Sequence, residues 1–348
     1  MNNWIDRRRF LGVAAGALAA PLLAGAGDLP ETPRTSMGIA SNAWDVHFKI
    51  KKLEPMDFLA QCRELGLAGM QLPLGTRDAD YCAALRQKAE QWGMYIEASI
   101  VLLGSRSIET FEQQLLTAKA AGAAVARSVV FPGRRYEYFT AAEQFAQASK
   151  RAMETLEKVE PIVAKHRMRL AVENHKDQRI PERLESLKRL SSEWIGVCVD
   201  LGNSFALCED PLEVARAYAP YAFSAHIKDQ SARECPEGFR FADMPLGKGF
   251  LDLPAMVKVL REAHPEVRFN YEVITRDPLL VPVLGPKYWA TMPDVPARDL
   301  GRTLQTVKSN GSKEPFPLAS SLPLDRQAEQ ELRDIRQSIS YARANLGL

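Results

Sequence analysis

Four short apolar segments of this chain each end in a residue that can bind a divalent cation. They lie at residues 169–173, 195–200, 222–226 and 269–272, and their last residues are Glu173, Asp200, His226 and Glu272. A buried strand has no packing reason to end in an ionisable side chain, because an unpaired buried charge is costly. Three carboxylates and one imidazole are ligands that Mn²⁺ or Mg²⁺ accepts. We therefore predict one metal site at these four strand ends.

The spacing of the four residues indicates a fold that brings them together. Glu173 and Asp200 are 27 residues apart, Asp200 and His226 are 26 apart, and Glu272 follows 46 residues later. The first two intervals each fit one strand and one returning helix, and the third fits one such unit with an insertion. Parallel strands with helical crossovers have their carboxyl ends on one face, where barrel enzymes have their active sites.

Strand-like and helix-like segments alternate along most of the chain. The strand candidates are residues 37–41, 69–72, 95–100, 126–131, 169–173, 196–200, 223–226 and 269–274. Helical patterns lie between them, near residues 55–65, 78–92, 107–121, 140–166, 181–191, 211–219 and 253–263. No G-x-G-x-x-G follows a strand, which counts against a dinucleotide-binding fold. The pattern predicts an α/β protein, a (β/α)₈ TIM barrel with an extra C-terminal helix.

The N-terminal residues are typical of an export signal. The sequence R-R-R-F-L at residues 7–11 fits the twin-arginine pattern, and an apolar run then ends in A-G-A at residues 24–26. We expect residues 1–26 to be a cleaved twin-arginine signal, with an uncleaved anchor as the alternative. The export machinery would then be a partner, the compartment would be the periplasm, and no stable membrane span would remain.

The rest of the chain divides into three expected parts: a linker at 27–36, the barrel at 37–305 and a C-terminal extension at 306–348. Insertions at 229–250 and 275–299 follow strands seven and eight, so both should overhang the site face as a lid, a binding wall or plain surface loops. A helix from about 325 to 345 has apolar residues at helical spacing, so it should pack on the barrel or on another subunit.

Composition narrows the classes of function. Without residues 1–26 the chain has 42 basic and 42 acidic residues, so no charge surplus marks a nucleic-acid partner. The five cysteines form no C-x-x-C and are odd in number, so we read them as mostly buried thiols.

Five motifs in order resemble the sugar phosphate isomerase/epimerase family of xylose isomerase-like TIM barrels. They are A-V-E-N-H at 171–175, V-D-x-G-N at 199–203, H-I-K-D at 226–229, P-L-G-x-G at 245–249 and Y-E at 271–272. The resemblance implies one divalent ion, often Mn²⁺ (with Mg²⁺, Co²⁺ or Zn²⁺ as alternatives), held by Glu173, Asp200, His226 and Glu272. It also implies that the two glutamates act as acid and base. Gln71 stands where many relatives have Glu, and Asn203 where epimerases of free ketoses often have His.

Four further residues are candidates for binding the substrate. His175 and Asn203 follow strand-end ligands, and Lys228 lies two residues after His226. Each has an ordinary alternative: a partner of Glu173, a turn asparagine and a surface lysine. Trp44, just after the first strand, would stack on a sugar or simply plug the barrel end.

The chemistry expected of such a site is enediolate formation on a carbohydrate carbonyl. One carboxylate removes a carbon-bound proton, and its return decides between epimerisation and isomerisation, while loss of a β-hydroxyl gives dehydration. We expect a metal-dependent isomerase or epimerase of a sugar or keto-sugar derivative, acting through a cis-enediolate. The alternatives are a lyase or hydratase using the same metal site, and a non-catalytic sugar-binding barrel. A homo-oligomer is left open.

Overall fold

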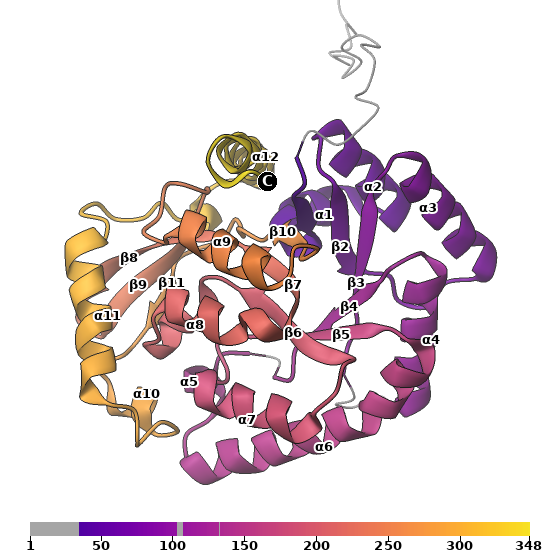
Figure 1. Ribbon diagram of the computed structural model, residues 1–348. Helices are drawn as coiled ribbons and strands as arrows, with labels where there is room; N and C mark the ends of the chain where they lie inside the picture. Colours follow the sequence, from indigo (N-terminus) through magenta and orange to yellow (C-terminus); the bar gives the residue numbers. More distant parts are fainter. Residues whose placement is uncertain (1–34, 103–106, 132) are drawn as a thin grey trace, which may run out of the picture.

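Eight parallel strands form a closed barrel in the computed structural model, which describes residues 35–102, 107–131 and 133–348 (Figure 1). The strands are β1 (Gly38–Ala40), β2 (Gly69–Pro73), β3 (Tyr95–Ser99), β4 (Val125–Ser128), β5 (Arg169–Glu173), β6 (Ile195–Asp200), β7 (Ala222–Ile227) and β10 (Phe269–Tyr271). Their order around the barrel is β1-β10-β7-β6-β5-β4-β3-β2. The predicted TIM barrel is therefore confirmed.

Seven helices surround the barrel where helices were predicted, each within two residues of the predicted limits. They are α2 (Pro55–Glu64), α3 (Ala79–Gln91), α4 (Ile108–Ala120), α6 (Ala142–His166), α7 (Ile180–Leu190), α8 (Pro211–Tyr218) and α9 (Leu253–Ala263). Local sequence explains where three of these helices begin. The side chains of Asp78, Ser107 and Asp210 accept hydrogen bonds from backbone N–H groups in the first turns of α3, α4 and α8. The apolar faces of these helices pack with the strands in one core.

The two insertions are not plain surface loops, because both contain strands. The first is a hairpin of β8 (Asp229–Cys235) and β9 (Gly238–Met244), and β11 (Leu279–Val281) of the second insertion pairs with β9. This antiparallel sheet has its own apolar core, which includes the buried Phe239 and Phe241. The side chain between them, Arg240, is exposed, so the hairpin has the alternation of a half-buried sheet.

Short helices and a long one complete this second layer and the barrel mouth. They are η1 (Ser41–Trp44), α1 (Asp45–Lys51), α5 (Arg135–Tyr138), η2 (Asn203–Leu207), α10 (Pro286–Trp289) and α11 (Ala297–Asn310). Helix α11 was not predicted, and it packs beside β8 at the edge of the molecule (Figure 1). The expected domain limit at 305/306 falls inside this helix.

The predicted C-terminal helix is α12 (Leu324–Tyr341), and it packs on the barrel. Its buried Glu331 accepts hydrogen bonds from the backbone N–H groups of Val46 and His47, at 3.0 and 3.2 Å. Ser338 accepts another from the backbone of Leu246, at 3.0 Å. Helix α12 thus joins the segment after β1 to the loop after β9.

The expected signal at 1–26 and most of the expected linker at 27–36 lie outside the described residues. Within the residues that the structure does describe, none of the helices has the length and apolar character needed to cross a membrane.

Candidate metal centre

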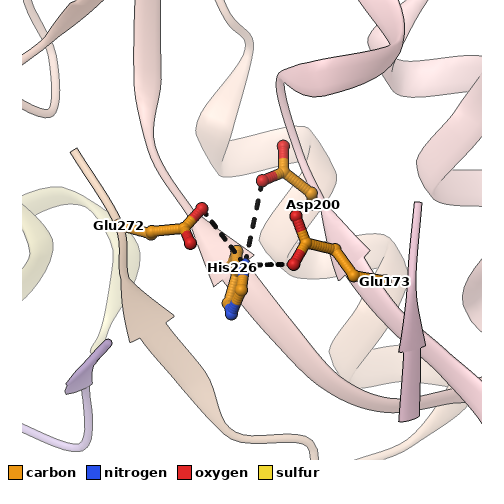
Figure 2. Close-up of side chains that lie close together, drawn as sticks. All are labelled: Glu173, Asp200, His226 and Glu272. Carbon is orange, nitrogen blue, oxygen red and sulfur yellow. Dashed lines mark ion pairs between the residues drawn. The ribbon is translucent and has the colours of Figure 1, made fainter. Parts of the chain in front are cut away.

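The four predicted ligands come together at the carboxyl ends of four adjacent strands. Glu173, Asp200 and His226 end or nearly end β5, β6 and β7, and Glu272 directly follows β10. Ligand atoms from the four residues all lie within 4.8 Å of one another, and all four side chains are buried. Figure 2 shows the three carboxylates arranged around the imidazole. His226 Nδ1 lies 3.2 Å from Glu272 Oε2, 3.5 Å from Glu173 Oε2 and 3.8 Å from Asp200 Oδ2.

Each carboxylate accepts hydrogen bonds from neutral donors through one oxygen, while its other oxygen faces the imidazole. Asp200 Oδ1 accepts the backbone N–H groups of Gly202 and Asn203, at 2.9 and 2.7 Å. Glu272 Oε1 accepts the amide of Asn42 at 3.0 Å, and Glu173 Oε1 accepts that of Asn203 at 3.1 Å. Because these contacts fix the carboxylates, the ligand atoms are positioned before any ion arrives.

The orientation of His226 suits metal coordination. Its Nε2 donates to Gln71 Oε1 at 2.7 Å, and Gln71 Nε2 donates to Glu97 Oε2 at 3.0 Å. The other ring nitrogen, Nδ1, is buried without a hydrogen-bond partner among the described residues. A bond through Nε2–H leaves the Nδ1 lone pair directed at the carboxylates. Hard oxygens plus this orphaned nitrogen fit a divalent ion, so the cluster could bind one.

Without a cation the cluster would keep a proton on the imidazole. Burial lowers the pKa of His226, but Cys198 and the carboxylates of Glu272 and Glu173 raise it, and the result is well above the ordinary value. A metal ligand must be a neutral imidazole, so an arriving ion would displace this proton.

Two cations that bind the carboxylates complete the centre. Arg127 on β4 makes an ion pair with Glu173 Oε2, and Lys228 Nζ lies 2.7 Å from both Asp200 Oδ2 and Glu272 Oε2. Burial raises the pKa of Glu173, but Arg127 and His226 outweigh it and hold that pKa below the usual range. For Glu272, His226 and Lys228 likewise outweigh burial, and its pKa is also lowered. Both glutamates are therefore ionised at neutral pH.

Three of the four predicted substrate-binding residues lie beside the centre. Lys228 contacts two carboxylates, as above, and Asn203 bonds to Glu173 and also accepts from Lys176 Nζ. His175 is half-buried, and its Nδ1 has no partner among the described residues. Burial and the neighbouring Lys176 lower the pKa of His175 to about 3, so its ring is neutral and can donate or accept a hydrogen bond.

Trp44 lies elsewhere. Its Nε1 donates to Gln61 Oε1 at 2.6 Å, and its ring stacks on His47 at 4.1 Å between centroids. The side chain is buried in the main core, so the structure does not bring it to the four ligands. The residue of this segment that does reach the centre is Asn42, through Glu272.

The H-I-K-D and P-L-G-x-G motifs meet in one structural contact. The carboxylate of Asp229 accepts backbone N–H groups of Gln230, Gly247, Gly249 and Leu251, at 2.8 to 3.2 Å. A side chain on Gly249 would collide with this carboxylate, since an added Cβ would lie 2.1 Å from Asp229 Oδ1. These residues shape the mouth of the barrel after β7.

A cavity of about 770 Å³ lies at the ends of β2, β3 and β4 and reaches Arg127, the ion-pair partner of Glu173. Arg127 is one of its lining residues, and Pro73, Ser99 and Ser128 mark the three strand ends. Arg151 and Lys158 of α6 also line it. Among the described residues no carboxylate does.

Sequence reasoning missed several residues of this site. Glu97 and Arg127 lie inside apolar strands, whereas the signal that identified the four ligands was an ionisable residue at a strand end. Asn42 and Lys176 lie in connections, where a polar residue is ordinary. Nothing in the sequence pattern marks them.

Comparison with known proteins agrees with the barrel fold. A family model described as xylose isomerase-like TIM barrel matches residues 59–291, about two thirds of the chain. The 3-oxo-isoapionate decarboxylase of Pectobacterium atrosepticum is 27% identical over 181 residues, which are 51% of this chain and 60% of that enzyme. The alignment thus spans less than two thirds of the relative.

Solved structures of similar fold include two of interest. One is D-psicose 3-epimerase, crystallised in the presence of D-fructose, with a TM-score of 0.56 and 14% identity over 90% of this chain and 99% of the other. Another is a xylose isomerase-like TIM barrel protein of Mycobacterium smegmatis in complex with magnesium. Its TM-score is 0.50, and it is 16% identical over 79% of this chain and 98% of its own. These two likenesses concern the fold. By the family match, the chain belongs to the xylose isomerase-like TIM barrel family.

Proposed function

We propose that the protein is a divalent-metal-dependent isomerase or epimerase of a sugar or keto-sugar derivative, acting through a cis-enediolate. One observation carries this proposal: Nδ1 of a buried imidazole faces three buried carboxylates, at 3.2 to 3.8 Å. Two of these belong to Glu173 and Glu272, which approach His226 from opposite sides (Figure 2). A mere binder of sugars needs no such pair.

The residues would divide the work as follows. Glu173, Asp200, His226 and Glu272 would hold the ion, with Mn²⁺ as our first choice. When bound, the ion would polarise the substrate carbonyl and stabilise negative charge on its oxygen. Glu173 and Glu272 are both ionised, so either can accept the carbon-bound proton, and the glutamate that has accepted it can then return it. Lys228, Asn203 and the neutral His175 would bind substrate oxygens.

A lyase is the second candidate, because the curated relative is named a decarboxylase. Decarboxylation and dehydration of a keto-sugar derivative also pass through an enediolate or enolate. The same metal and the same acid–base pair would serve them. The two proposals differ in the bonds that break: only a C–H bond beside the carbonyl in isomerisation or epimerisation, that C–H bond and the β C–O bond in dehydration, and a C–C bond to the departing CO₂ in decarboxylation.

The compartment that we propose rests on the N-terminal motif alone. We propose export by the twin-arginine machinery to the periplasm, on the basis of R-R-R-F-L at 7–11 and A-G-A at 24–26. A substrate without phosphate fits that compartment, since phosphorylated sugars are uncommon outside the cytoplasm.

Proton exchange in D₂O tests the proposed function. The Mn²⁺-loaded protein would be incubated with a panel of ketoses and 3-keto-glycosides and followed by NMR. We expect deuterium to enter beside the carbonyl of at least one substrate, and the product to show whether it is an epimer, an isomer or a lyase product. Glu173→Gln and Glu272→Gln should each slow exchange at least about 100-fold, given the usual contribution of a positioned acid or base.

Glu193→Gln, at an exposed position between α7 and β6, is the matched control and should exchange like the wild type. If the loaded protein exchanges no substrate of the panel, or if both glutamate variants exchange normally, the proposed chemistry is wrong.

A further inference from the structure

The chain itself places as many cations as carboxylates at the metal centre. Three cations, Arg127, Lys176 and Lys228, lie among the three carboxylates that would bind the ion. The nearby Arg276 and Asp243 cancel each other, at 2.8 Å. A bound divalent ion therefore leaves a surplus of positive charge in a buried site. Such a site favours an anion over a neutral molecule.

Lys176 is the cation with no counter-charge of its own. Arg127 and Lys228 are each paired with carboxylates, but Lys176 Nζ donates only to the amide oxygen of Asn203, in the part of the chain that the structure describes. The side chain is 2% exposed. Burial, together with Lys228 and Arg276, lowers its pKa to about 7. An ammonium is rarely buried in this way unless something pairs with it.

The position of Lys176 places it next to the reacting groups. Asn203 accepts from Lys176 and donates to Glu173 Oε1 at 3.1 Å, so a single side chain separates the ammonium from a proposed acid–base residue. Lys176 is on the β5–α7 connection, at the carboxyl end of the barrel, where substrate would enter. The cavity that reaches Arg127 from the same end also has only cations among its described titratable lining residues.

We propose that the substrate carries a carboxylate, and that Lys176 pairs with it. The substrate class would be keto-sugar acids, whose carbonyl and neighbouring hydroxyl remain free for the metal centre. This inference rests on the proposed function and narrows it from carbohydrates in general to their acids. The carboxylate supplies the counter-charge that Lys176 lacks and removes part of the surplus.

Two probes that differ only at C1 test the inference. 2-Keto-D-gluconate is D-fructose with the C1 alcohol replaced by a carboxylate. Calorimetric titration of the Mn²⁺-loaded protein should show the acid binding at least about 10-fold more tightly than D-fructose, which is the effect of one well-placed charged contact. Lys176→Met should bring the ratio of the two affinities close to one, whatever its effect on the binding of D-fructose itself. Lys176→Arg should keep most of the preference.

Lys188→Met, on the exposed side of α7, is the matched control and should keep the full preference. The methyl ester of 2-keto-D-gluconate, tested on the wild type, should bind no better than D-fructose, and this arm does not depend on any variant folding. Equal affinity for acid and D-fructose would overturn the inference. So would a preference that survives in Lys176→Met, because the metal alone would then be binding the carboxylate.

These results separate the inference from the proposed function. Proton exchange on neutral ketoses without a preference for the acid would leave the enzyme proposal standing and overturn the role of Lys176. If the protein binds the acid through Lys176 but takes up no metal and exchanges no proton, the role of Lys176 stands and the enzyme proposal is overturned.

Discussion

Residues that touch no ion decide whether His226 can bind one. The ring is fixed by Gln71, and Gln71 in turn by Glu97, which also accepts from Ser224 at 2.6 Å and Asn270 at 2.9 Å. Burial raises the pKa of Glu97, while these donors oppose the shift. The chain of contacts below the metal centre selects the Nε2–H tautomer, and so leaves Nδ1 for the ion.

Replacing Gln71 by Met should therefore weaken metal binding without removing a ligand. Met has a similar length but cannot accept from His226 Nε2, so the imidazole loses its orientation. We expect a 10- to 100-fold loss of Mn²⁺ affinity, as is usual for partners of metal ligands. Competition with a chelator would measure it. Gln91→Met, exposed on α3, is the control, and an unchanged affinity in Gln71→Met would show that this contact does not orient the ring.

The four ligands could be predicted because an ionisable residue at the end of an apolar strand has few structural explanations. A broader rule, which also counts ionisable residues inside apolar strands, would have found Glu97 and Arg127. It cannot find Asn42 or Lys176, since polar residues in connections are common and only the folded chain shows what they contact. Trp44 illustrates the opposite limit: a large aromatic residue after a strand fits the core as well as a sugar.

The connections between helices and strands also contain buried ionisable side chains, and Glu209 is the clearest case. It lies between η2 and α8, and its Oε1 accepts the backbone N–H of Ile180, the first residue of α7, at 2.8 Å. The residue is 4% exposed. Burial raises its pKa from 4.5 to about 7, although Ile180 and Arg179 oppose the shift. The folded protein therefore favours the protonated carboxyl.

This shift predicts how stability depends on pH. A raised carboxyl pKa gives stability that is complete below the unfolded pKa of 4.5 and is lost as pH rises through the folded pKa of about 7. Glu209→Gln removes the charge and can still accept from Ile180. Its free energy of unfolding, compared with that of the wild type, should rise between pH 4.5 and 7 by up to about 3 kcal/mol.

Urea unfolding of the metal-free proteins at several pH values would measure this difference. Glu213→Gln, on the exposed face of α8 and paired with Arg302 at 3.0 Å, is the matched control and should give no such trend. If the free energies of unfolding of Glu209→Gln and the wild type change in parallel with pH, the role given to Glu209 is wrong.

Elements with a regular period were predictable, and elements that depend on distant partners were less so. The helices around the barrel show apolar residues at helical spacing and were found within two residues. The pairing of β11 with β9 joins two insertions that are far apart in sequence, so no local pattern specifies it. Helix α11 did have a signal, since Leu300, Leu304 and Val307 pack into the second core at helical spacing.

At the scale of the molecule, the order of strands in the closed barrel decides which residues meet at the site. Four ligands more than 20 residues apart meet because β5, β6, β7 and β10 are neighbours in the barrel, and β4 adds Arg127 from the next position. The antiparallel sheet and α12 fix the surrounding connections, through Asp229 and Glu331. The barrel thus brings both the four ligands and the cations beside them to one face.

Metal stoichiometry tests the central claim most directly. Elemental analysis of the purified chain after Mn²⁺ loading and dialysis should give one ion per chain. His226→Gln and Asp200→Asn should each give well under half of that, while His166→Gln, at the end of α6 and away from the cluster, should keep one. A well-folded wild type that keeps no divalent ion, or ligand variants that keep a full one, would contradict the account of this site.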